Sequence, residues 1–271
     1  MTVLALAGPG DVLPLAAGAV VLLMVALWAV SVALRDVSIV DPAWGPAFVV
    51  VAVAAALAGD GDSGRRVLLL VLTAVWGLRL GVHLTRRKLG ELGHEDSRYA
   101  EMRKKRGSGF VPYSLVVVFG FQAFLVIVVS LPLQVAAGRP AVMTAAVVPG
   151  VVLWAVGLFF ETVGDAQLDR FKADPDSKGQ VMDRGLWRYT RHPNYFGDFC
   201  VWWGLFLVAL PAGGLWWTAI GPVVMSLLLI QVSGKGLLEK SIGSRRPGYA
   251  EYVERTSGFI PLPPKPRFSN R

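Results

Sequence analysis

Charged side chains are scarce in this chain of 271 residues: they make up 17% of it, against 54% hydrophobic residues. A soluble domain usually carries about a quarter charged residues. The deficit is concentrated, because residues 13–34 form a run of 22 residues without a charge, and roughly 20 apolar residues can span a bilayer. The stretch before this run has no lysine or arginine, which a cleaved signal peptide would need, so we interpret the run as a retained span.

Cysteine and histidine are also rare. The lone Cys200 excludes an intramolecular disulfide and a cysteine-based zinc cluster, and because it falls in an apolar stretch we expect it to pack. The three histidines, His83, His94 and His192, are far apart along the chain, so no metal site is predicted. The G-x-G-x-x-G and Walker A patterns of common nucleotide sites are absent.

Seven apolar segments predict an all-α, polytopic membrane protein with about seven transmembrane helices. They cover about 13–34, 40–58, 67–85, 114–136, 142–164, 196–210 and 215–232. No soluble domain is left over, so residues 1–271 are read as a single membrane-embedded domain. Pro211, Gly213 and Gly214 predict a tight hairpin between the last two segments.

The positive charges predict the orientation of the spans. Of the 27 lysines and arginines, 23 lie at Arg35, in the 86–113 and 165–195 loops, and after residue 232. Because basic loops stay in the cytosol, we expect these loops and the C-terminus to be cytosolic and the N-terminus to lie outside. The net charge of +8 is then a topology signal and a lipid-headgroup contact, and does not indicate nucleic-acid binding.

Three polar residues inside the predicted spans are the candidate catalytic groups. Burying a charge in the bilayer costs several kcal/mol, so such residues usually have a function or a charged partner. Asp41 precedes Pro42, which suits either a helix N-cap or a polar group that lines a substrate cavity. Arg79 and His83 are four residues apart, so they share a helix face. That face fits a functional pocket, or a pairing of Arg79 with a buried acid.

Two acids end the fifth apolar segment. Glu161 and Asp165 are also four residues apart, and like charges at this spacing repel unless a cation or a donor lies between them. Either they belong to a solvated helix end, or they form the wall of a polar ligand site.

Residues 185–198 combine cations, rings and small residues in one short segment. Arg188 and Arg191 can bind phosphates through planar, bidentate donors, and Gly197 allows a close backbone approach. The rings that could stack on adenine or nicotinamide are Trp187, Tyr189 and Tyr195. The alternative interpretation is an aromatic and basic belt at the membrane interface.

The run Arg191-His192-Pro193-Asn194-Tyr195-Phe196-Gly197-Asp198 resembles the cofactor-binding signature of the membrane steroid 5α-reductase and sterol-reductase superfamily. Asp165-x-Gln167 precedes it, Trp202-Trp203-Gly204 follows it, and Tyr249-Ala250-Glu251-Tyr252 lies in the tail. With Val40-Asp41-Pro42-Ala43-Trp44-Gly45, these motifs are similar to the bacterial branch called DUF1295. The resemblance covers most of the chain, and its most specific part is the C-terminal third.

This resemblance implies an NADPH-dependent reductase that acts on a carbon–carbon double bond of a lipid from the bilayer, in a bacterial plasma membrane. Residues 1–140 would hold the substrate-side helices and residues 141–271 the cofactor-binding part. Carried over onto this sequence, the cofactor-binding residues are Asp165, Gln167, Lys172, Arg188, Arg191, His192, Asn194, Tyr195, Asp198, Tyr249 and Tyr252.

Two features leave the function open. Steroid 5α-reductases pair a membrane glutamate with a tyrosine in the N-terminal half, but all six tyrosines here follow the third apolar segment, so no donor for the substrate carbonyl is identified. Isoprenylcysteine and phospholipid methyltransferases, which use S-adenosylmethionine, carry a similar Arg-His-Pro segment. They typically have a Glu-Glu pair where this chain has Glu239-Lys240.

Overall fold

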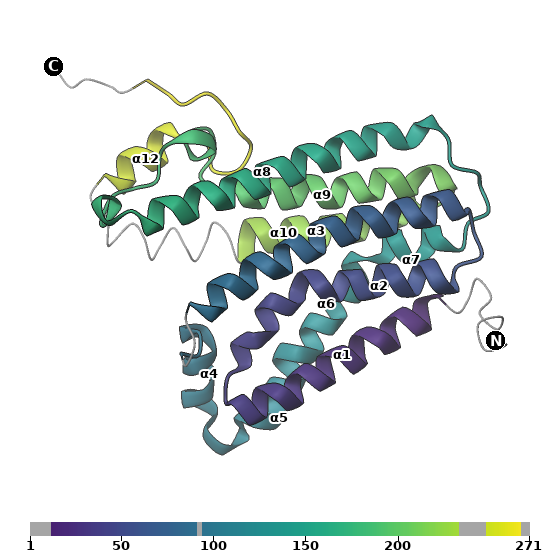
Figure 1. The fold of residues 1–271 in the computed structure, drawn as a ribbon, viewed down its shortest axis with the longest axis horizontal. Helices are drawn as coiled ribbons and strands as arrows, with labels where there is room; N and C mark the ends of the chain where they lie inside the picture. The colour runs from purple at the N-terminus through teal and green to yellow at the C-terminus, as the bar shows by residue number, and fades with distance from the viewer. Residues whose placement is uncertain (1–11, 91–93, 233–247, 267–271) are drawn as a thin grey trace. The chain divides into compact units, whose positions relative to one another are not determined.

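The computed structural model describes residues 12–90, 94–232 and 248–266, and this part of the chain is helical (Figure 1). Six helical stretches in it are long and apolar enough to cross a membrane, and a shorter apolar stretch covers Trp216–Gln231. The six are Val12–Leu34, Val37–Ala58, Ser63–Leu89, Ser97–Val129, Ala145–Ala173 and Pro193–Ala212. The predicted all-α, polytopic membrane protein is confirmed.

The chain divides into two compact units, which are described separately. Unit 1 comprises residues 1–147 and 205–221, and unit 2 comprises residues 148–204 and 222–271. Within unit 1 the main helices are α1 (Val12–Leu34), α2 (Trp44–Ala58), α3 (Ser63–Leu89), α6 (Phe121–Val129) and α7 (Leu131–Ala137). Within unit 2 they are α8 (Val148–Ala173), most of α9 (Pro193–Ala209) and of α10 (Ile220–Leu227), and α12 (Tyr249–Arg255).

Small residues let the helices of unit 1 approach closely. A Cβ on Gly45 of α2 would lie 2.3 Å from the carbonyl oxygen of Gly77 on α3, so the two backbones touch there. Ala55 and Ala58 of α2 pack with Val12 of α1 in a buried apolar cluster. Lipid offers no hydrophobic drive for helix association, so this backbone proximity is the main source of packing energy.

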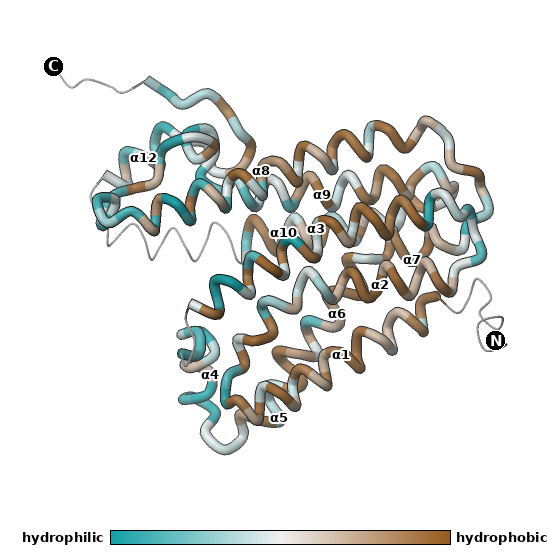
Figure 2. Tube along the Cα trace, in the orientation of Figure 1, coloured by the Kyte–Doolittle hydropathy of each residue, from teal (hydrophilic) through white to brown (hydrophobic). Residues whose placement is uncertain are grey.

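The outward faces of these helices are apolar, as a lipid-facing surface requires. Leu22 of α1 is 71% exposed and Leu57 of α2 is 62% exposed. Figure 2 shows hydrophobic colours along α1, α2 and α3, and hydrophilic colours on α4 (Ser97–Arg106) and α12.

Much of two predicted loops is helical. The sequence predicts a loop over 86–113, but α3 continues to Leu89 and α4 lies within the predicted loop. A 3₁₀ turn (Gly107–Gly109) and α5 (Phe110–Ser114) follow α4. A π-helical turn (Leu115–Gly120) then leads into α6. Likewise α8 continues to Ala173, beyond the predicted end at 164. Hydropathy locates the apolar part of a helix only, whereas arginine, lysine, glutamate and alanine are good helix formers in water.

Helices α8 and α9 of unit 2 pack antiparallel through a row of glycines. A Cβ on Gly197 of α9 would lie 2.5 Å from the amide nitrogen of Glu161 and 2.6 Å from the carbonyl oxygen of Gly157, both on α8. One heptad on, a Cβ on Gly204 would lie 2.7 Å from the amide nitrogen of Trp154. Cys200 lies in this interface and is buried, so its predicted packing role is confirmed.

The predicted hairpin after α9 is also present. Gly213 and Gly214 adopt positive φ angles of 89° and 66°, which residues with a Cβ rarely adopt. After the turn, the indole nitrogen of Trp203 on α9 donates to the hydroxyl of Ser226 on α10 at 3.1 Å. The two helices therefore run side by side.

Candidate functional site

Asp41 is the centre of a polar site in unit 1. It lies in a 3₁₀ helix (Val37–Ala43) that leads into α2. One carboxylate oxygen accepts the hydroxyl hydrogen of Tyr99 at 2.8 Å, and the other accepts from the guanidinium of Arg98 at 2.8 Å. The N-cap interpretation of Asp41 is wrong, because α2 is capped at Ala43 without a side-chain hydrogen bond. The backbone turns through Pro42 in a 3₁₀ helix first, which leaves the Asp41 side chain free to point at α4.

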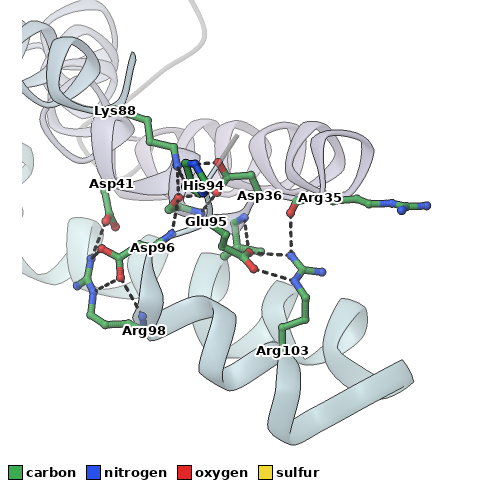
Figure 3. A network of polar contacts seen from close by, with 11 residues as sticks. Arg35, Asp36, Asp41, Lys88, His94, Glu95, Asp96, Arg98 and Arg103 are labelled. Carbon is green, nitrogen blue, oxygen red and sulfur yellow. Dashed lines mark hydrogen bonds and ion pairs between the residues drawn. The ribbon is translucent and has the colours of Figure 1, made fainter. Parts of the chain in front are cut away.

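Helix α4 delivers both partners of Asp41. Its N-cap is Asp96, whose side chain accepts from the amide nitrogen of Arg98 at 2.9 Å. The Arg98 guanidinium lies between the carboxylates of Asp41 and Asp96 (Figure 3), with 2.9 Å from Nε to Asp96. Tyr99, the next residue, is buried, with only 6% of its surface exposed. A buried phenol therefore meets a carboxylate that a guanidinium neutralises.

A second set of contacts binds the start of α4 to the end of α1. Glu95 forms a bidentate ion pair with Arg103 at 2.7 and 2.8 Å, and it also accepts from the amide nitrogen of Val37 at 2.9 Å. Arg103 is one helical turn beyond Tyr99, so the two side chains share a face of α4. The Glu95–Arg103 pair thus fixes the face of α4 that carries Tyr99.

Asp36 makes the third connection, to the end of α3. Lys88 donates to Asp36 at 2.7 Å and to the hydroxyl of Ser38 at 2.6 Å. Lys88 also donates to the carbonyl oxygen of His94 at 2.8 Å (Figure 3). We call Asp36, Asp41, Lys88, Glu95, Asp96, Arg98, Tyr99 and Arg103 the Asp41 network. It joins the ends of three apolar stretches around one phenol–carboxylate contact.

The acids at the rim of this network favour their ionised forms. Partial burial opposes ionisation of Asp36, but hydrogen bonds from Lys88 and Ser38 outweigh it, so the pKa of Asp36 is held below its usual value. Burial is likewise outweighed at Glu95 by the hydrogen bonds from Arg103, which lowers the pKa of Glu95. Acids with a lowered pKa stabilise the fold above their unfolded pKa, about 4, and this contribution is lost as the pH falls through the folded pKa.

We therefore expect acid to weaken unit 1 through these two groups. Glu95→Gln should lower the free energy of unfolding at pH 7 by about 1.5 kcal/mol, the low end for a charged hydrogen bond because Arg103 is 35% exposed. It should also flatten the loss of thermal stability between pH 5 and about pH 3, followed by tryptophan fluorescence in detergent. Glu101→Gln is the matched control, because Glu101 is an exposed residue of the same helix. Equal melting curves for the two variants at both pH values would contradict the assignment.

Arg79 and His83, the other candidate catalytic residues, lie on α3 and are half-buried. Asp41 has Arg98 and Tyr99 as its described partners, so the structure connects this carboxylate to α4 and not to the α3 pair. Tyr99 and Arg98 are thus site residues that the sequence interpretation missed. A signal for them was present, since Asp96 before Ser97 is a helix start and places Tyr99 and Arg103 on one face.

The cofactor candidates lie in unit 2, where α8 meets the start of α9. Asp165 is buried and accepts from the side-chain amide of Asn194 at 3.1 Å. Glu161 is buried one turn earlier, so the solvated-end interpretation of these two acids does not hold. The Asn194 amide is a donor of the kind expected here, and it serves Asp165.

Gln167 shapes the turn that precedes the signature. Its side-chain oxygen accepts from the amide nitrogen of Leu186 at 2.9 Å. A Cβ on Gly185 would lie 2.4 Å from the Gln167 side chain, and Gly185 has a φ of +57°, so only glycine fits there. The indole nitrogen of Trp187 donates to the carbonyl oxygen of Gly164 at 2.9 Å, which holds the turn against α8.

The candidate residues differ sharply in exposure. Arg188 and Lys172 are exposed cations, whereas Arg191, His192, Asp198, Tyr249 and Tyr252 are buried. The rings of His192 and Tyr195 stack at a centroid distance of 5.4 Å. The hydroxyl of Tyr252 donates to the carbonyl oxygen of Trp187 at 2.6 Å, and burial raises the pKa of that phenol.

The apolar helical stretches, with polar sites in both units, define an integral membrane protein of the all-α class. The chain belongs to the DUF1295 family of proteins of unknown function, whose model matches residues 27–256. No curated protein and no solved structure matches the chain.

Proposed function

We propose that this protein is an NADPH-dependent reductase that acts on a carbon–carbon double bond conjugated to a carbonyl in a membrane lipid. The observation that carries the proposal is the hydrogen bond from Tyr99 to Asp41. The signature at 191–198 resembles that of the steroid 5α-reductase superfamily, whose steroid 5α-reductases pair a membrane glutamate with a tyrosine. The Tyr99–Asp41 contact supports assigning the role of that tyrosine to Tyr99. We place the 86–113 and 165–195 segments on the cytosolic side, as the count of lysines and arginines predicts.

Unit 1 would recognise the substrate. The Tyr99 hydroxyl can turn about its C–O bond from Asp41 to a carbonyl oxygen, and a donor at that oxygen stabilises the negative charge that develops during reduction. Asp41 holds the hydroxyl in place before substrate binds, while Arg98 balances the charge of Asp41. The apolar surfaces of α1 and α2 support entry of the substrate from the bilayer.

Unit 2 would bind the cofactor. NADPH, when bound, supplies a hydride to the β-carbon of the double bond, with a proton from water completing the reduction. The residues present fit such a ligand: Arg188 and Lys172 are exposed cations for phosphates, and Asp165 and Asn194 are hydrogen-bonding groups for hydroxyl or amide groups. The Gly185 turn, which admits no side chain, keeps the backbone accessible beside Gln167.

Thermal stabilisation in detergent tests this proposal directly. A ligand at 100 times its dissociation constant stabilises a protein by about 2.7 kcal/mol, so NADPH should raise the melting temperature and S-adenosylmethionine should not. Arg188→Gln should weaken NADPH binding about tenfold or more, since a charge-assisted contact contributes about 1.5–3 kcal/mol. Arg184→Gln, which removes another exposed cation of the same segment, is the control and should bind as the unchanged protein does. Stabilisation by S-adenosylmethionine alone would replace the proposal with a methyltransferase.

A further inference from the structure

The signature arginine Arg191 is engaged with the C-terminal segment, which we define as residues 248–265. Its guanidinium donates through one nitrogen to the carbonyl oxygens of Val253 at 2.8 Å and Thr256 at 3.0 Å. Its backbone amide donates to the carbonyl oxygen of Ser257 at 2.9 Å. The carbonyls at the end of a helix have no partner within the helix, and a cation there also interacts favourably with the helix dipole. Arg191 therefore caps the end of α12.

The neighbours of Arg191 bind the same segment. The hydroxyl of Thr190 donates to the carbonyl oxygen of Phe259 at 2.8 Å, and Thr190 forms a parallel bridge with Ser257. The carbonyl oxygen of Tyr189 accepts from the amide nitrogen of Leu262 at 3.0 Å. Of residues 188–191, Arg188 is thus an exposed cation, and the next three residues are bound to the C-terminal segment.

Two side chains of α12 complete the attachment from the other direction. Tyr252 donates to the carbonyl oxygen of Trp187, and Arg255 pairs with Asp183 at 2.6 Å. Residues 183–191 and 248–265 therefore form one hydrogen-bonded surface, although Ser257 lies 67 residues after Thr190 along the chain.

We infer that Arg191 and Tyr252 are positioning residues, which fix the C-terminal segment on the signature and do not contact a cofactor phosphate. This inference rests on the proposed function only in calling the signature a cofactor site. Arg191 is 7% exposed and its Nη1 donates to the carbonyl oxygens of Val253 and Thr256, whereas Arg188, three residues earlier, is exposed. The phosphate role of this segment therefore falls to Arg188, and the C-terminal segment remains docked whether or not cofactor is bound.

Limited proteolysis of the full-length protein in detergent tests the docking. Cleavage of a docked segment follows the fraction of molecules in which it opens. Arg191→Gln should speed trypsin cleavage after Arg255 about tenfold or more, because it removes two hydrogen bonds from a charged donor. Arg188→Gln should leave the cleavage rate unchanged. Arg191→Lys, which keeps the charge on a single donor nitrogen, gives an intermediate rate and serves if the glutamine variant does not fold.

A disulfide between Thr190→Cys and Ser257→Cys separates positioning from cofactor contact. Thr190 and Ser257 are partners in a parallel bridge, so a disulfide between these two positions would join the C-terminal segment to residues 183–191. In the oxidised double variant, NADPH binding should persist. When Arg191→Gln is added to this variant, the disulfide should restore the NADPH binding that Arg191→Gln alone removes. A phosphate ligand could not be rescued in this way, so failed rescue with unchanged proteolysis overturns the inference. If the unchanged protein does not bind NADPH at all, the proposed function fails, while the proteolysis result still decides the role of Arg191.

Discussion

Tyr99→Phe should reduce turnover by about 100- to 1000-fold, the usual effect of removing one donor that is aligned with a developing oxyanion. The change removes the hydroxyl that donates a hydrogen bond to Asp41 and leaves the buried ring in place. The measurement uses membranes of a deletion strain that carries each variant. The lipid that accumulates in the deletion strain is supplied with NADPH, and its saturated product is quantified by mass spectrometry.

Tyr113→Phe is the matched control for this substitution. Tyr113 lies on α5, and its ring packs against the guanidinium of Arg106 at 4.2 Å, a contact that phenylalanine keeps. The turnover of Tyr113→Phe should equal that of the unchanged protein.

Asp41→Asn provides a second variant of the site. It keeps an oxygen for Tyr99 but loses the ion pair with Arg98, so the free energy of unfolding should fall by less than about 1 kcal/mol while turnover falls more than tenfold. Full turnover in both site variants would rule out the Asp41–Tyr99 pair as the substrate site.

Gly197→Leu should destabilise unit 2 by about 3 kcal/mol, the upper end for overpacking, or prevent accumulation of folded protein. Even the Cβ would lie 2.5 Å from a backbone nitrogen of α8, and a backbone cannot move aside as a side-chain tip can. The helices would have to separate along the whole row of glycines. The yield of monodisperse protein after detergent extraction and its melting temperature measure the effect.

Gly18→Leu supplies the comparison for this prediction. Gly18 lies on α1 with nothing within 4 Å of its Cβ position, so a leucine there adds an apolar side chain to open space. We expect normal yield and a melting temperature close to that of the unchanged protein. If both glycine variants accumulate equally well, the close approach of α8 and α9 is not what holds unit 2 together.

The glycine interface shows how far local sequence reasoning reaches. The sequence indicated that Gly197 allows a close approach, because glycine has no Cβ. It did not indicate the partner. Gly157 and Glu161 are opposite Gly197 only because α8 and α9 pack antiparallel with that register.

The two arginines of residues 185–198 show the opposite case, in which residue type alone does not distinguish two surroundings. Two arginines three residues apart looked equivalent as phosphate ligands. The structure leaves Arg188 exposed and buries Arg191 against the end of α12, because α12 returns to the signature from a distant part of the chain. Whether either binds a phosphate remains the proposal that the Arg188→Gln and Arg191→Gln experiments test.

The sequence by itself determined that this is an all-α membrane protein with about seven apolar segments, and where its polar residues fall along the chain. Span formation depends on local composition, since every backbone group in lipid must be satisfied within its own helix. Tertiary structure alone decided which polar groups meet. Asp41 and Tyr99 are 58 residues apart, and their contact follows from the helical start of α4, the ion pair of Arg98 with Asp41 and the hydrogen bond from Val37 to Glu95. Such contacts depend on packing between distant segments, which the periodicity of one segment does not encode.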